Sequence, residues 1–140
     1  MSGYLLDTNI ISDLIRNPSG AAAQRIAQLG AKGICTSIVV AAELRYGCAK
    51  KGSPRLLAKV QALLETIPVL ALDLPADCDY GRIRAELEAA GQPIGGNDLL
   101  IAAHACTLRL TLVTNNTREF ARIRGLKVEN WLCAMETRSA

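Results

Sequence analysis

Aromatic side chains are scarce in this sequence: only 4% of its 140 residues are Phe, Trp or Tyr. Half of the residues are hydrophobic, so the core has to be built mainly from aliphatic side chains. A chain of this length is typical of one domain and buries roughly two-thirds of the surface that its unfolded form exposes. The sequence therefore predicts a single domain that needs no disulfide or zinc ion to hold it together.

The cysteines form no recognisable framework. Cys35, Cys48, Cys78, Cys106 and Cys133 are scattered, odd in number and free of any Cys-x-x-Cys pair, which disfavours both a zinc site and a disulfide scaffold. The chain also lacks a signal-peptide pattern and any apolar run long enough to cross a bilayer. These absences predict a cytoplasmic protein in a reducing compartment, with no membrane partner.

The charge is mildly basic, with a formal net charge of +3 and a pI near 8.7. This balance is compatible with an anionic partner such as a nucleic acid, but it does not establish one, because net charge says little about where the charges lie.

Strand and helix patterns alternate along the chain, which is typical of a parallel sheet covered by helices. No repeat or linker divides the chain, and the residues after Trp131 read as a tail. Ser19 and Ser53 are the expected caps of the second and fourth helices. Strands are expected at residues 4–6, 34–36, 69–72, 111–114 and 127–129, and helices at 10–15, 19–29, 38–49, 54–66, 75–90 and 98–110.

Polar side chains are expected at one edge of this sheet. Asp7 directly follows the first strand, Asn115 and Asn116 follow the fourth, and Asp98 begins a helix after a glycine-rich loop. Glu43 lies about two turns into the helix after the second strand. Ligands of parallel α/β sheets bind outside the carboxyl ends of the strands. A divalent ion relieves repulsion between crowded carboxylates and offsets charge on a phosphate, so this set of residues favours phosphodiester hydrolysis.

Each acid also has a plainer structural interpretation. Asp7 and Asp98 could each cap the helix that follows it. Glu43 lies in an apolar stretch, so it either sits at the edge of a buried face or has a polar partner inside.

The other titratable groups favour structural roles. His104, the only histidine, is interpreted as a packed or hydrogen-bonded structural residue. The side chains of Arg45, Arg82 and Arg84 could steer phosphates, and solvated helix faces explain them equally well.

Four segments together resemble the PIN-domain ribonucleases and, within them, the VapC toxins of bacterial toxin–antitoxin pairs. They are residues 4–9 (YLLDTN), 37–47 (SIVVAAELRYG), 91–102 (GQPIGGNDLLIA) and 112–120 (LVTNNTREF). The first segment alone has little specificity, whereas all four in this order and at this spacing are specific. The similarity runs from Tyr4 to about Trp131, nearly the whole chain.

The resemblance implies a PIN-like α/β fold, with a central parallel sheet of about five strands covered by helices on both faces. It implies a PIN domain over residues 1–132 and a C-terminal tail over 133–140. The implied activity is Mg²⁺-dependent cleavage of RNA, with Mn²⁺ as a substitute. Asp7 and Asp98 would ligate the metal directly or through water. Glu43 would orient the attacking water or act as its base.

The resemblance also implies partners. A small VapB-type antitoxin would fill the groove with its C-terminal segment and block the metal site. The family usually forms homodimers, and such toxin–antitoxin assemblies often bind operator DNA through the antitoxin.

One position departs from the family pattern: many PIN domains have a fourth acid where this chain has Asn116. We include Asn116 in the catalytic set, because an amide can still bind a metal or water, and Glu119 is a candidate for the missing carboxylate. The closing segment also resembles VapC toxins that cut initiator tRNA in its anticodon stem-loop.

Two alternatives to a toxin nuclease remain. The first is a PIN-like module that has lost catalysis and only binds antitoxin or RNA, an interpretation that Asn116 keeps open. The second is a haloacid-dehalogenase-type phosphatase, which needs a second Asp where this chain has Asn9. That alternative ranks last.

Overall fold

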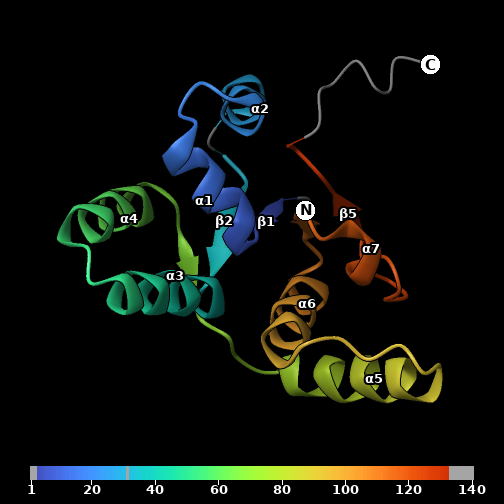
Figure 1. Ribbon diagram of the computed structural model, residues 1–140. Helices are drawn as coiled ribbons and strands as arrows, with labels where there is room; N and C mark the ends of the chain where they lie inside the picture. Colours follow the sequence, from blue (N-terminus) through green and yellow to red (C-terminus); the bar gives the residue numbers. More distant parts are fainter. Residues whose placement is uncertain (1–2, 31, 133–140) are drawn as a thin grey trace.

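The centre of the fold is a parallel sheet of five short strands in the order β3-β2-β1-β4-β5. The computed structural model describes residues 3–30 and 32–132 (Figure 1). β1 pairs with β2 on one side and β4 on the other, so that Leu5 lies opposite Cys35 and Leu112. The strands are β1 (Tyr4–Leu6), β2 (Ile34–Ser37), β3 (Val69–Leu70), β4 (Thr111–Val113) and β5 (Val128–Glu129). The predicted parallel sheet of about five strands is confirmed.

The helices fall into two groups on opposite faces of the sheet. From β1 the chain adds β2 and then β3 on one side of the sheet, and it later adds β4 and then β5 on the other side. Crossovers between parallel strands are right-handed, so connections that run in opposite directions along the sheet lie on opposite faces. The first four helices therefore cover one face and the last three cover the other, as Figure 1 shows. The helices are α1 (Thr8–Arg16), α2 (Ala21–Leu29), α3 (Ile38–Lys51), α4 (Pro54–Thr66), α5 (Ala76–Ala89), α6 (Gly96–Leu108) and α7 (Thr117–Phe120).

The core is aliphatic and centred on β1 and β4. Leu5, Leu6, Leu112 and Val113 are all completely buried, because helices cover both faces of the strands that carry them. Trp131 is 2% exposed and closes the core beyond β5, with its ring centroid 5.0 Å from that of Tyr4. The strands that carry the candidate site are therefore the most firmly packed in the domain.

Several predicted boundaries differ from the structure, and two of the differences have a clear physical reason. Ser19 does not cap α2, because the helix begins at Ala21 and Gly20 takes the N-cap position without a side-chain hydrogen bond. A Cβ at Gly20 would lie 3.0 Å from the Cβ of Asn17, so the tight turn favours glycine there. The third strand ends at Leu70 rather than residue 72, because its partner β2 ends at Ser37 and leaves no further strand to pair with.

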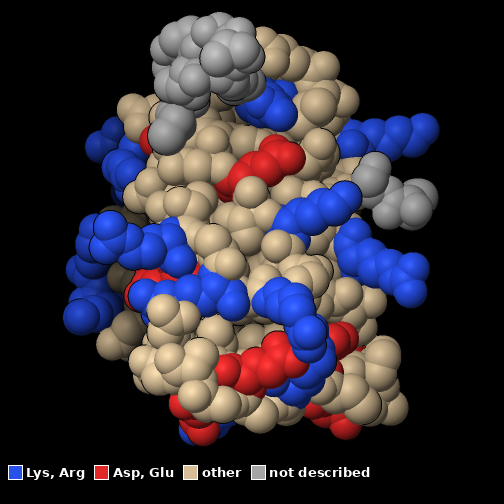
Figure 2. All heavy atoms as spheres, turned by 90° about the vertical axis from the view of Figure 1, so that its right-hand side faces the viewer, with Lys and Arg blue, Asp and Glu red and all other residues tan. Residues whose placement is uncertain are grey.

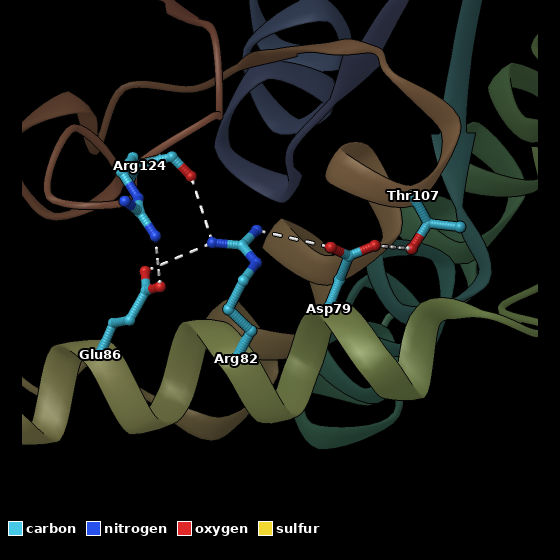
Figure 3. A network of polar contacts seen from close by, with 5 residues as sticks. All are labelled: Asp79, Arg82, Glu86, Thr107 and Arg124. Atoms are coloured by element: carbon cyan, nitrogen blue, oxygen red, sulfur yellow. Dashed lines mark hydrogen bonds and ion pairs between the residues drawn. The ribbon is translucent and has the colours of Figure 1, made fainter.

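A polar network on α5 ties the second group of helices together (Figure 3). Asp79 accepts a hydrogen bond of 2.6 Å from the hydroxyl of Thr107 on α6. It also forms an ion pair with Arg82, at a distance of 3.4 Å. Glu86 forms ion pairs with Arg82 at 3.3 Å and with Arg124, beyond α7, at 2.8 Å. The network thus holds α6, which carries Asp98, and the segment between α7 and β5 against α5.

Within the described residues, the structure contains neither a disulfide nor a membrane-spanning helix. Cys35, Cys48, Cys78 and Cys106 are free thiols, and Cys133 lies outside the described residues, as does the predicted tail 133–140. None of the described helices combines the length and apolarity needed to cross a bilayer.

Candidate active site

Asp7 is the most buried acid of the predicted set, with 4% of its surface exposed. Its Oδ1 accepts a hydrogen bond of 2.8 Å from the backbone N–H of Thr8, so Asp7 does cap α1. Its Oδ2 accepts further hydrogen bonds from the hydroxyl of Thr114 at 2.7 Å and the amide of Asn9 at 3.3 Å. Burial raises the pKa of Asp7, the hydrogen bonds from Thr114 and Thr8 oppose that rise, and the charge of Glu43 adds to it.

The loop after β4 is bound to the residues that follow β1. The backbone N–H of Asn115 donates to Oδ1 of Asn9 at 2.8 Å, and that of Asn116 donates to the hydroxyl oxygen of Thr114 at 3.0 Å. β1 and β4 are the neighbours at which the strand order reverses, the usual position of a ligand site in such sheets. Asn116 therefore lies at the expected edge, and its side chain makes no hydrogen bond with a described residue.

Glu43 has polar partners on both carboxylate oxygens. The hydroxyl of Thr8 donates a short hydrogen bond to Oε1, and the amide of Asn97 donates to Oε2 at 3.1 Å. The start of α3 is fixed by Ser37, whose hydroxyl accepts from the backbone N–H of Val39 at 3.0 Å. Of the two interpretations of Glu43, the one with a polar partner is confirmed, and both partners adjoin other acids of the site.

Asp98 lies in the first turn of α6 rather than at its cap. The helix begins at Gly96 with Gly95 as N-cap, so the alternative that Asp98 is the N-cap is wrong. Its side chain makes no hydrogen bond with a described residue. Burial and then the charges of Asp7, Glu43 and Glu119 raise the pKa of Asp98 to about 6. The charges of three other carboxylates therefore act on Asp98, and together these four residues form what we call the acid cluster.

The acid cluster fits a partly hydrated divalent ion better than a fully protein-bound one. Among the described residues, no group of three or more His, Cys, Asp or Glu side chains could hold a metal ion by itself. Mg²⁺ usually takes only one or two carboxylates and keeps several waters. No described residue donates to either carboxylate oxygen of Asp98, and Oδ1 of Asp7 accepts one hydrogen bond from the described residues and so retains an acceptor site.

His104 joins two of the helices that carry acids. It is 1% exposed, and its Nδ1 lies 2.8 Å from the hydroxyl oxygen of Ser37, the cap of α3. Its Nε2 has no hydrogen-bond partner within reach among the described residues. Burial lowers the pKa of His104, although the Ala71 carbonyl partly opposes this. The predicted structural role of this histidine agrees with its contacts.

The three arginines considered as phosphate contacts are largely engaged elsewhere. Arg45 donates to Gln61 at 3.0 Å, Arg84 forms an ion pair with Glu88 at 2.9 Å, and Arg82 belongs to the α5 network. Their positions on solvated helix faces explain them without a phosphate.

A groove opens beside the acid cluster between α1, α3 and α4. It has a volume of about 240 Å³, and its wall includes Thr8 and Glu43. Arg16 and Lys51 add positive charge to the same wall, while Leu44 and Val60 supply apolar surface. We call this the α1–α3–α4 groove.

Sequence reasoning missed the side chains that orient the acids. Thr8 and Asn9 follow Asp7, Asn97 precedes Asp98, and Thr114 precedes the Asn pair. The available signal was that each is a hydroxyl or amide residue directly beside a polar group already singled out.

Positive charge gathers on the face formed by the second group of helices. Residues 117–127 carry four Lys or Arg side chains and one acid, which accounts for the whole net charge of +3. Figure 2 shows Lys and Arg side chains across the middle of this face, with acids mainly toward the end where α5 lies. Arg118, Arg122 and Lys127 form no ion pair with any described residue.

Comparison with known proteins gives consistent matches over nearly the full length. The sequence profile of the PIN domain matches residues 4–126. The tRNA(fMet)-specific endonuclease VapC of Shigella flexneri is 42% identical over 132 residues, covering 94% of this chain and 99% of that protein. Ribonuclease VapC2 of Haemophilus influenzae is 39% identical over 133 residues, covering 94% of this chain and 100% of that protein.

Solved structures match equally well. VapBC2 from Rickettsia felis, bound to a DNA fragment from its promoter, superposes with a TM-score of 0.85 at 39% identity, covering 94% of this chain and 99% of that one. DNA-bound VapBC from Salmonella typhimurium gives the same TM-score, identity and coverage.

Proposed function

This chain belongs to the PIN-domain family and, within it, to the VapC ribonucleases, and on that premise we propose that it is the toxin of a VapBC pair, an endoribonuclease that cuts tRNA. The resemblance inferred from four sequence segments is thereby confirmed at the level of the family. PIN-domain nucleases generally depend on a divalent metal ion. The ion proposed here is Mg²⁺, with Mn²⁺ as a substitute, because the cluster offers only oxygen ligands.

Asp7 and Asp98 are the proposed metal ligands, and the bound ion would neutralise negative charge that develops on the phosphate. Glu43 is the proposed base or orienting group for the attacking water. Its two hydrogen-bond donors, Thr8 and Asn97, adjoin the proposed ligands and fix its carboxylate relative to them. Asn116 would add an uncharged oxygen at the same edge.

The charge of the acid cluster is the observation that carries this proposal. Burial and then the charges of Asp7, Glu43 and Glu119 raise the pKa of Asp98 to about 6. Repulsion of this kind destabilises a fold unless a cation offsets it, and perturbed carboxyl groups at a sheet edge are typical of functional sites.

Initiator tRNA is the proposed substrate, because the Shigella relative is named for tRNA(fMet) and the segment 112–120 resembles that branch of the family. The positive charge of residues 117–127, which begin directly after Asn116, supports a polyanionic substrate.

The proposed partner is a VapB-type antitoxin whose C-terminal segment enters the α1–α3–α4 groove. The groove suits a peptide with apolar and acidic side chains, because Arg16 and Lys51 lie on its wall beside apolar residues. Operator DNA would be bound through the antitoxin, the toxin would act as a homodimer in the cytoplasm, and the PIN domain would span residues 1–132.

The test is cleavage of synthetic initiator tRNA by the purified protein. Cleavage is expected with Mg²⁺ or Mn²⁺, none with EDTA, and none by Asp7→Asn, whose far-UV circular dichroism and melting should remain those of a folded protein. Retained divalent-dependent cleavage by Asp7→Asn would remove Asp7 from the mechanism.

The same assay examines the second candidate, a catalytically impaired module, which the uncharged Asn116 favours. That candidate predicts that the protein binds tRNA or the antitoxin but leaves the RNA intact at every divalent-ion concentration tried.

A further inference from the structure

Tyr46 on α3 is an aromatic residue that the fold does not use. Its surface is 65% exposed, whereas Phe120 and Trp131 are buried. Tyr4 packs on Trp131, and Tyr80 is half-buried and accepts a hydrogen bond from Arg84 at 2.9 Å. In a sequence with so few aromatics, one large ring is thus left in water while the other four are packed or hydrogen-bonded.

The position of Tyr46 connects it with the acid cluster. It follows Glu43 by three residues on the same helix, and residues at this spacing are neighbours on a helix surface. Tyr46 is not part of the wall of the α1–α3–α4 groove, although Glu43, Gly47 and Lys51 of the same helix are. The ring therefore lies beside Glu43 but outside the groove proposed for the antitoxin.

A lysine side chain lies close to the Tyr46 ring. The ammonium group of Lys50 lies 5.9 Å from the centroid of the Tyr46 ring, within cation–π range. Lys50 forms no ion pair with any described residue, so its charge is available to an anionic ligand.

An exposed ring next to an unpaired cation suits one particular ligand. Proteins that read RNA stack unpaired bases on aromatic side chains and contact the neighbouring phosphates with basic ones. We propose that Tyr46 stacks on an unpaired base beside the scissile bond, and that Lys50 contacts the adjoining phosphate. This inference rests on the proposed ribonuclease function and deepens it: the enzyme would select RNA with splayed bases, such as a loop, over a continuous duplex.

The test compares two synthetic RNAs with the same protein. Binding is measured by fluorescence anisotropy in the Asp7→Asn background, so that the RNA stays intact, using a labelled hairpin with an unpaired loop and a labelled blunt duplex of equal length. Tyr46→Leu should weaken hairpin binding roughly 5- to 150-fold, the loss typical of one stacked base, and leave duplex binding unchanged. Tyr46→Phe, which keeps the ring, should bind the hairpin as the parent does.

Lys50→Gln should weaken hairpin binding and lower its salt dependence by about one ion. The matched control is Lys59→Gln, an exposed lysine on α4, which should bind as the parent does. Because Tyr46 and both lysines are exposed, none of these substitutions removes a core contact.

Unchanged hairpin binding by Tyr46→Leu, or an equal loss on hairpin and duplex, overturns the inference while leaving the nuclease proposal standing. A Tyr46→Leu variant that binds RNA normally but no longer copurifies with the protein encoded by the neighbouring gene would assign the ring to a protein interface and overturn it too. If the parent binds neither RNA and the wild type cuts none, the proposed function fails and the inference fails with it.

Discussion

Replacing Asp98 with Asn should stabilise the metal-free protein at neutral pH while removing its nuclease activity. Burial and then the charges of Asp7, Glu43 and Glu119 raise the pKa of Asp98 from 3.8 to about 6, and no described residue donates a hydrogen bond to its carboxylate. Each pK unit corresponds to 1.36 kcal/mol, which sets a ceiling of about 3 kcal/mol. Water screens this half-buried group, so we expect a gain of about 1–2 kcal/mol.

The sign of the pH dependence follows from the direction of the shift. A carboxyl whose pKa is raised by folding favours the protonated folded state, so the wild type loses stability as the pH rises from about 4 to 6. Below that range both Asp98 and its Asn replacement are neutral, and the two proteins should be equally stable. The full difference should be present above pH 6.

The measurement is thermal unfolding with EDTA between pH 4 and 8. The expected gain corresponds to a rise in Tm of roughly 3–8 °C at pH 7.5. The control is Asp77→Asn, because Asp77 also lies in the first turn of a helix but its side chain is exposed. A gain no larger than that of the control, or one independent of pH, would refute the argument from burial and repulsion.

Three further predictions concern the surroundings of the cluster. Asn116→Asp should tighten Mg²⁺ binding in calorimetric titration, and an unchanged Kd would put this residue outside the coordination shell. Thr114→Val removes the hydroxyl that donates to Asp7, so the pKa of Asp7 should rise and the acid limb of the cleavage–pH profile should move to higher pH; an unmoved limb would contradict the role given to that hydrogen bond. Ser53→Ala removes the cap that accepts from Leu56 and should lower unfolding free energy by about 1 kcal/mol in urea, with cleavage unaffected.

The position of Asp7 at one edge of the sheet was predictable from the sequence, whereas the side chains that orient it were not. Asp7 directly follows an apolar run, and the carboxyl edge of a parallel sheet is a general place for ligands, so a local pattern indicated where Asp7 lies, while its role as a metal ligand stays a prediction. The contact of Thr114 with Asp7 depends on β4 lying next to β1, a pairing between segments more than a hundred residues apart. Local periodicity carries no information about which distant strands become neighbours.

Predicted helix boundaries were wrong where contacts between distant parts of the chain decide where a helix begins. The sequence does not predict α7, because Thr117–Phe120 is too short to display a helical period. Asp98 resembled a cap because Asp is a favoured N-cap residue, yet Gly95 takes that position and leaves Asp98 in the first turn of the helix.

The central place of β1 has a consequence for protein synthesis. The strand that leads to the hydrogen-bonding hydroxyl of Thr114 is made more than a hundred residues after Asp7. A growing polypeptide therefore lacks this support for Asp7 until β4 has been translated. The order of the strands thus keeps the acid cluster incomplete while the intervening helices are being made.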